Sequence, residues 1–218
     1  MLLAAQITDL ALLIHTLLNK GKFGGGDSLD NLKQQNRQLI AENEALKHAL
    51  ESEKNRACRD SLTGIANRRA YEQRLEAEIN HSNRSDRPFS LLVWDIDNFK
   101  QINDRFGHQI GDQILIACAQ ELHNQVRSCD FTARFGGEEF VSVIPDCPLS
   151  QACNIAESLR SRIAELAIAT SRGVIHVTLS CGIAEFTPNS DADELFNRAD
   201  RALYHAKKHG KNRISSMG

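Results

Sequence analysis

The sequence predicts an α+β fold in which helices pack on a sheet built around an antiparallel hairpin. Apolar segments at residues 131–135 and 140–144 indicate two strands, and the glycines between them suit a tight connection. A continuous apolar run over residues 89–94 is typical of a buried central strand. Segments of helical periodicity separate the strands, and this order favours the α+β class.

The main domain is expected to cover residues 58–218. The 218 residues of the chain are enough for one sizeable core and an extension. Apolar and polar residues alternate over residues 174–186, which predicts one long half-buried strand. Helices are expected over residues 68–83, 99–106, 109–127, 150–166 and 192–209.

The residues before this domain are expected to be helical. We predict an amphipathic helix over residues 1–20, a glycine-rich linker at 21–27 and a coiled-coil stalk at 28–57. The glycine run is also typical of an introduced linker. The stalk would be about 45 Å long and would pair two copies of the chain, although asparagine and glutamate weaken its seam. Its heptad a and d positions hold Leu29, Leu32, Asn36, Leu39, Asn43, Leu46, Leu50 and Glu53.

The helix at residues 1–20 is not expected to cross a membrane. It is short, and Gln6, Asp9 and His15 interrupt its apolar stripe. Two roles stay open for it, which are packing back on the stalk and receiving a regulatory protein.

Charge and cysteine content narrow the class of protein further. The net charge of −2 gives no sign of a nucleic-acid-binding surface. The six cysteines show no C-x-x-C spacing, and several lie in apolar segments, which favours free thiols in a reducing compartment. We therefore expect a soluble protein of the cytoplasm that does not bind nucleic acid.

Acidic residues gather at two predicted strand ends. Asp95 and Asp97 follow the strand at 89–94, and Glu138 and Glu139 lie at the hairpin turn. Two acidic sites beside strand ends suit a hard cation such as Mg²⁺, which prefers oxygen ligands. Plainer interpretations are a solvated hairpin tip and, for Asp97, a cap on the helix that follows.

These motifs resemble the GGDEF family of diguanylate cyclases, over residues 59 to the C-terminus. Residues 60–69 read DSLTGIANRR, residues 95–112 read DIDNFKQINDRFGHQIGD, and the signature loop at 136–140 is the GGEEF variant. Residues 198–208 read RADRALYHAKK and are similar to the closing helix of the family. The resemblance implies a palm-like βαββαβ sheet with packed helices, related to nucleotide cyclases.

The resemblance also implies an activity and a metal site. Two GTP molecules would be joined into cyclic di-GMP with release of two pyrophosphates, a reaction that depends on alignment and charge neutralisation. Asp95, the carbonyl of Ile96 and Glu138 would hold Mg²⁺, with Mn²⁺ as a substitute. Glu139 would serve a second metal or help to activate the attacking hydroxyl.

Further positions would contact the nucleotide. Phe99 and Lys100 would supply backbone amides and charge near the phosphates, and Lys207 and Lys211 would contact the terminal phosphates. A solvated surface is the plainer interpretation of the lysines, and the family often has arginine at position 211. The guanine base would be read in the region of Asn103, His108 and Asp112, since a carboxylate can accept from both donors of guanine. Asp112 could instead cap a helix.

A regulatory signature precedes the hairpin. Arg127 and Asp130 fit the R-x-x-D product-binding site of the family, whose chemistry suits guanine and phosphate. A surface ion pair is the plainer interpretation. Arg160 is the candidate for a further arginine, although Ser158 could occupy that position.

Taken together, the residues predict a diguanylate cyclase that acts as a dimer of GTP-bound domains. One alternative is a catalytically silent module that binds GTP or cyclic di-GMP and acts through its N-terminal helices. A second alternative is a scaffold without nucleotide turnover. The intact Asp95, Glu138, Glu139 and Lys207 favour the enzyme over both.

Overall fold

The computed structural model describes residues 26–188 and 190–217, and it divides the chain into two units at residues 56 and 57. The helix expected over residues 1–20 lies outside the described residues. So does most of the linker expected at 21–27, whose last two residues belong instead to helix α2 (Gly26–Ala57).

Helix α2 carries a stripe of exposed leucines. Leu32, Leu39, Leu46 and Leu50 are 52%, 63%, 70% and 58% exposed. They occupy the a and d positions of the predicted heptads, so the side chains expected to form a seam are free for a partner. Among the described residues, the helices lack the combination of length and apolar character that a membrane span needs.

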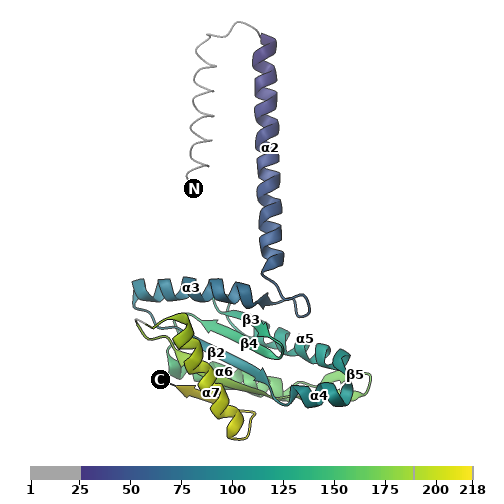
Figure 1. Cartoon of the computed structure of the whole chain (residues 1–218), viewed down its shortest axis with the longest axis vertical. Coiled ribbons are helices and arrows are strands. Elements are labelled where there is room, and N and C mark those ends of the chain that lie inside the picture. Colours follow the sequence, from purple (N-terminus) through teal and green to yellow (C-terminus); the bar gives the residue numbers. More distant parts are fainter. Residues whose placement is uncertain (1–25, 189, 218) are drawn as a thin grey trace. The chain divides into compact units, whose positions relative to one another are not determined.

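The second unit is built on a six-stranded sheet (Figure 1). The hairpin of β3 and β4 and the central pairs β4–β2 and β2–β7 are antiparallel, whereas the two edge strands, β1 and β8, pair in parallel with β3 and β7. Across the sheet the order is β1 (Ala66–Asn67), β3 (Phe131–Gly136), β4 (Glu139–Ile144), β2 (Ser90–Ile96), β7 (Leu179–Glu185) and β8 (Ile214–Met217).

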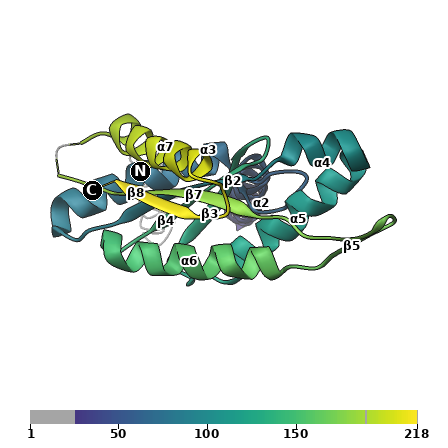
Figure 2. The ribbon, with the colours of Figure 1, turned by 90° about the horizontal axis from the view of Figure 1, so that it is seen from below.

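Helices cover both faces of this sheet, as Figure 2 shows. Helices α3 (Arg68–Ser85) and α7 (Ala192–Lys208) pack on one face, and α5 (His108–Asn124) and α6 (Leu149–Glu165) on the other. Because alternate residues of a strand face opposite sides, Leu91 and Val93 join the core under α3 and α7. Leu92, Trp94 and Ile96 join the core under α5 and α6. All seven residues of β2 are therefore buried, as its apolar run predicts.

Helix α4 (Phe99–Phe106) begins three residues after β2 and leads directly into α5. Asn98 precedes α4 with a left-handed backbone (φ 58°) and makes no side-chain cap. The interpretation of Asp97 as a helix cap is wrong, since its carboxylate is buried and accepts hydrogen bonds from other elements. The cap interpretation of Asp112 is also wrong, because α5 begins at His108 and Asp112 lies inside it.

Two expected elements differ from the structure by more than two residues at one end. The strand expected over residues 174–186 is divided: β6 (Gly173–Ile175) pairs with β5 (Ile168–Thr170) in a separate hairpin, and only β7 enters the main sheet. Alternation with a period of two cannot distinguish one sheet from two. The helix expected to reach residue 127 ends at Asn124, because the Asp130 carboxylate binds the backbone N–H of Arg127.

Candidate functional site

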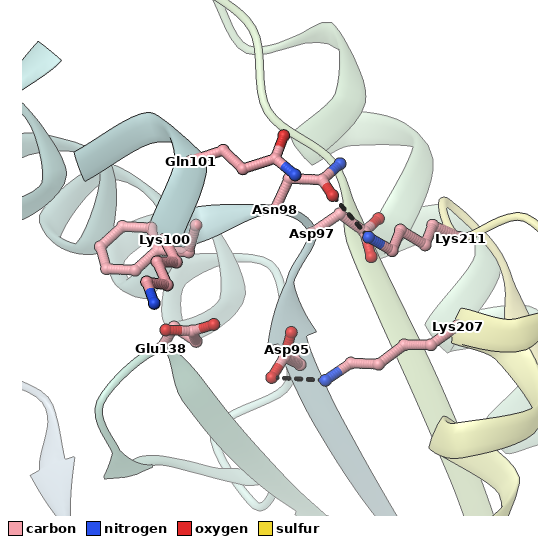
Figure 3. Close-up of a pocket in the computed structure, with 9 residues that line it drawn as sticks. Asp95, Asp97, Asn98, Lys100, Gln101, Glu138, Lys207 and Lys211 are labelled. Atoms are coloured by element: carbon pink, nitrogen blue, oxygen red, sulfur yellow. Dashed lines mark hydrogen bonds and ion pairs between the residues drawn. The ribbon is translucent and has the colours of Figure 1, made fainter. Parts of the chain in front are cut away.

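A cavity of about 280 Å³ opens where β2 ends and α4 begins (Figure 3). Strand β2, helix α4, the hairpin turn and the end of α7 each contribute side chains to it. These elements come from residues more than 100 apart in the chain, and the sheet order brings them together. The cavity is lined by Asp95, Asp97, Asn98, Phe99, Lys100, Gln101, Glu138, Lys207 and Lys211.

Asp95 lies at the centre of this group. Its carboxylate forms an ion pair of 2.8 Å with the Lys207 ammonium, and its side chain is only 9% exposed. Burial raises the pKa of Asp95, and the hydrogen bond from Lys207 opposes this shift. Since Asp95 points to the face covered by α7, the register of β2 fixes its approach to Lys207.

The two glutamates of the turn lie beside Asp95. Glu139 is the direct partner of Asp95 in the β2–β4 register, and the Glu138 carbonyl accepts the N–H of Ile96 at 3.3 Å. The pKa values of Glu138 and Glu139 are both raised. Burial is the larger cause, and the negative charge of Asp95 is the next. The carboxylates of Asp95, Glu138 and Glu139 thus lie close together, and Lys207 pairs with Asp95. A divalent cation would stabilise this excess of negative charge.

The donor set fits a weakly ligated cation. Among the described residues, no three acidic, histidine or cysteine side chains converge into a complete metal cage. Mg²⁺ needs none, because it commonly takes one or two carboxylates and fills its other positions with water and substrate phosphates. Asp95 and Glu138, both lining the cavity, are therefore a sufficient protein contribution.

Arg134 holds the hairpin turn in place. The Arg134 guanidinium donates to the Gly137 carbonyl from Nη2 (2.7 Å) and Nε (3.0 Å), and it pairs with Asp60 at 3.1 Å. Gly137 has a φ of 48°, which suits glycine. Asp60 also accepts from the backbone and hydroxyl of Thr63. The opening signature and the hairpin thus form one brace that holds Glu138 in place.

Two further lysines and two side-chain amides also line the cavity. Lys100 is the second residue of α4 and is exposed, whereas Phe99 before it is buried. Lys211 follows α7 and donates to Asn98 Oδ1. Asn98 and Gln101 were not predicted as site residues. Asn98 lies between Asp97 and α4, and Gln101 lies in the first turn of α4, so their closeness to Asp97 in the chain is the signal that could have suggested them.

The residues expected to read guanine lie on α4 and α5 and do not line the cavity. His108 and Asp112 are exposed, and Asn103 lies over Gly111 so closely that a Cβ there would be 1.9 Å from Asn103 Oδ1. That oxygen is buried and makes no hydrogen bond within the described chain.

The R-x-x-D residues lie elsewhere, in the turn between α5 and β3. Arg127 pairs with Asp130 at 2.7 Å and also donates to the Pro145 carbonyl at 3.1 Å. Arg160 makes no described contact with either of them, and its guanidinium binds Glu157 and Asn212 instead. The structure therefore joins Arg127 to Asp130 but does not join Arg160 to that pair.

Known proteins are similar to this chain in sequence and in fold. The sequence model described as "Diguanylate cyclase, GGDEF domain" matches residues 57–213. The diguanylate cyclase DgcP of Pseudomonas aeruginosa is 42% identical over 165 residues, which make up 76% of this chain and 25% of DgcP. The chain thus spans a quarter of the length of that relative.

Two crystal structures extend the similarity beyond the second unit. The coiled coil and GGDEF domain of DgcB from Caulobacter crescentus, in complex with c-di-GMP, is 31% identical with a TM-score of 0.79, covering 85% of this chain and 99% of that one. The diguanylate cyclase SiaD of P. aeruginosa, in complex with its activator SiaC, is 29% identical with a TM-score of 0.76, covering 99% of this chain and 82% of SiaD. With its signature loop, sheet order and acidic cavity, the chain belongs to the GGDEF-domain family of diguanylate cyclases.

Proposed function

We propose that the protein is a diguanylate cyclase, which condenses two GTP molecules into cyclic di-GMP and two pyrophosphates. The observation that carries this proposal is the composition of the cavity, in which Asp95 and Glu138 face Lys100, Lys207 and Lys211. Carboxylates for a divalent cation and ammonium groups for phosphates are the two needs of phosphoryl transfer. Family membership supports the same reaction.

Each residue has a distinct proposed role. Asp95, Glu138 and the carbonyl of Ile96 would hold the divalent cation, which when bound supplies charge neutralisation at the phosphates. Glu139, next to Asp95 in the sheet, would hold a second cation or accept the proton of the attacking hydroxyl. The raised pKa of Glu139 suits a proton acceptor that operates near neutral pH.

The remaining groups bind and align GTP. Lys100, Lys207 and Lys211 would contact the phosphates, with the backbone at Phe99 close to them. Each 3′-hydroxyl oxygen attacks the α-phosphorus of the other nucleotide. A P–O bond forms, and the bond to the β-phosphate oxygen breaks as pyrophosphate leaves. The lysines offset the negative charge that gathers on this leaving group.

Asn103 and Asp112 are proposed to read guanine. The exposed Asp112 carboxylate can receive both the ring N–H and the exocyclic amino group of guanine, a donor pair that adenine lacks, and Asn103 is proposed to contact the same base. His108, at the start of α5, is proposed to border the same base.

A single experiment tests the activity. The purified chain is incubated with GTP and Mg²⁺, and the products are identified by chromatography and mass spectrometry. We expect cyclic di-GMP and pyrophosphate in a ratio of one to two. Binding of GTP without any product would favour the silent module, and turnover of ATP at an equal rate would contradict the guanine roles.

We also propose that two copies pair through α2. Burying the four exposed heptad leucines of α2 would stabilise the helix, and a second copy of the chain presents an identical leucine stripe for this. Leu39→Asp should lower the dimer fraction in sedimentation and the specific activity at low protein concentration. Ala41→Asp places the same charge at heptad position f, outside the seam, and should change neither. An unchanged dimer in Leu39→Asp would refute this pairing.

Product inhibition and partner binding complete the proposal. Arg127 and Asp130 are proposed to bind cyclic di-GMP, since the arginine can pair with guanine edges and phosphates and the aspartate can accept from the guanine donors. The expected place for a regulatory protein, the N-terminal helix, lies outside the described residues. The similarity to activator-bound SiaD over 99% of this chain supports such a partner.

A further inference from the structure

The loop that follows α7 has an unfavourable backbone. Gly210, Lys211 and Asn212 have φ angles of 112°, 60° and 45°, so three consecutive residues lie in the left-handed region. Glycine and asparagine tolerate this region, but lysine does so only at a cost. Such a loop keeps its shape only where contacts with the surrounding structure hold it.

Backbone contacts fix the loop on the sheet side. The N–H of Asn212 donates to the Asp97 carboxylate at 2.9 Å, and the Arg213 carbonyl accepts from Cys181 at 3.0 Å. Asp97 is itself held by the hydroxyls of Thr178 (2.6 Å) and Ser180 (2.7 Å). These contacts secure the backbone of the loop, but they leave the Asn212 side chain to another partner.

That partner is Arg160 of helix α6. Its Nη1 donates to Asn212 Oδ1, while its Nη2 and Nε donate to Glu157 at 2.6 Å and 3.0 Å. The Arg160 side chain is only 15% exposed, and Arg160 does not line the cavity. The planar guanidinium thus joins α6 to the loop in a geometry that a lysine could satisfy only in part.

The neighbour of Asn212 in the loop is a cavity residue. Lys211 lines the cavity and donates to Asn98 Oδ1 at its rim. We infer that Arg160 is a positioning residue, which holds Asn212 and thereby keeps Lys211 directed at the phosphates of GTP. This inference rests on the proposed function, in which Lys211 contacts those phosphates.

Loss of this contact has a defined consequence. Without Arg160, the Asn212 side chain loses its hydrogen-bond donor. Fewer contacts then hold Lys211 in its unfavourable left-handed backbone conformation. The loop then visits other conformations, and the apparent affinity for GTP falls in proportion to the competent fraction. Saturating GTP selects the competent loop conformation, so KM rises while kcat stays unchanged.

Arg160→Ala should therefore raise the KM for GTP about tenfold, with kcat within about twofold of wild type. Arg160→Lys should restore part of the loss. The matched control is Arg162→Ala, which removes an arginine of the same helix that pairs with Glu121 at 2.7 Å and does not touch the loop. Its KM should stay within about twofold of wild type.

A double variant tests whether Arg160 acts through Lys211. If it does, Arg160→Ala combined with Lys211→Ala should raise KM no further than Lys211→Ala alone. Additive losses would overturn the inference. Asn212→Gly removes the acceptor while tolerating the backbone, so it should reproduce the Arg160→Ala effect and serves as the second variant if Arg160→Ala does not fold.

Amide hydrogen exchange gives a reading that does not depend on catalysis. The amides of Lys211 and Asn212, which donate to Ala206 and Asp97, should exchange faster in Arg160→Ala and not in Arg162→Ala. Unchanged exchange at both amides would overturn the positioning role. If the wild type makes no cyclic di-GMP, the proposed function fails, and the exchange experiment still decides whether Arg160 holds the loop.

Discussion

The cavity at the end of β2 and the turn between α5 and β3 both concentrate charge, but they balance it differently. In the cavity, burial raises the pKa of Asp95 and Glu138, and Lys207 forms an ion pair with Asp95. In the turn, the Asp130 side chain is 1% exposed and accepts from both the guanidinium and the backbone of Arg127.

This difference separates two kinds of binding site. Glu138 lines the cavity and forms no ion pair with another described residue, so a cation bound there would meet an unpaired carboxylate. A ligand at the turn must compete with an ion pair that is already formed. We therefore expect substitutions in the cavity to lower activity more than stability, and substitutions in the turn to lower stability as well.

The largest effect is expected at Glu138. Glu138→Gln should reduce synthesis of cyclic di-GMP by roughly 10²–10³-fold, as when an active site loses a group that stabilises charge. The thermal midpoint should not fall, because the substitution removes a carboxylate that burial disfavours. Asp146→Asn, at an exposed pair with Arg87, is the control and should leave synthesis unchanged. Near-normal turnover in Glu138→Gln would exclude this residue from the metal site.

Gly111→Ala should have the next largest effect. The new Cβ would lie 1.9 Å from Asn103 Oδ1 and 3.1 Å from the Phe99 ring, so Asn103 must move. We expect a loss of about 1–3 kcal/mol in unfolding free energy and a higher KM for GTP. Gly136→Ala, where a Cβ meets no atom within 4 Å, should leave the unfolding free energy almost unchanged. Equal unfolding free energies of the two variants would mean that the Asn103 side chain can move away without destabilising the fold.

Arg127→Ala tests the paired turn. It leaves the buried Asp130 carboxylate without its cation, so the unfolding free energy should fall by about 1–3 kcal/mol in chemical denaturation. Added cyclic di-GMP should no longer slow the variant, whereas its turnover without product should be kept. Arg87→Ala removes an exposed pair and should cost less than about 0.5 kcal/mol. If added cyclic di-GMP does not slow the wild-type protein, Arg127 and Asp130 only stabilise the turn and do not bind the product.

The smallest effect concerns pH. The pKa of Glu138 is raised in the folded protein, so its protonated form favours folding at acidic pH, and this contribution is lost as the pH rises through that pKa. Without divalent cations, Glu138→Gln should melt roughly 2 °C higher than wild type near pH 7.5 and equally near pH 4. Scanning calorimetry at both pH values checks this. A wild type that is the more stable protein at pH 7.5 would contradict the raised pKa.

Much of the fold could be predicted from local patterns. The apolar run before Asp95 indicated the central strand, and the glycines at 136 and 137 indicated the hairpin. Alternation along β2 also places Asp95 and Ile96 on opposite faces. These features depend on the spacing of neighbouring side chains, which the sequence contains directly.

The parallel edge strands and the divided strand over residues 174–186 could not be predicted in this way. β1 and β8 are short and pair with strands distant in the chain, so their own residues carry no periodic signal. The hairpin of β5 and β6 shares its alternation with β7. Whether such segments join one sheet or two depends on the partners that the topology offers.

The residues of the candidate site also fall into a group that the sequence predicts and a group that depends on the tertiary structure. The sequence by itself determined which side chains can hold a cation or phosphates, because carboxylates such as Asp95 and Glu138 and lysines such as Lys207 have that chemistry wherever they lie. Only the tertiary structure decided that Asp97 secures a loop and that Arg160 joins Asn212, 52 residues away. Contacts of this length are set by how helices pack on a sheet, and no local pattern encodes that packing.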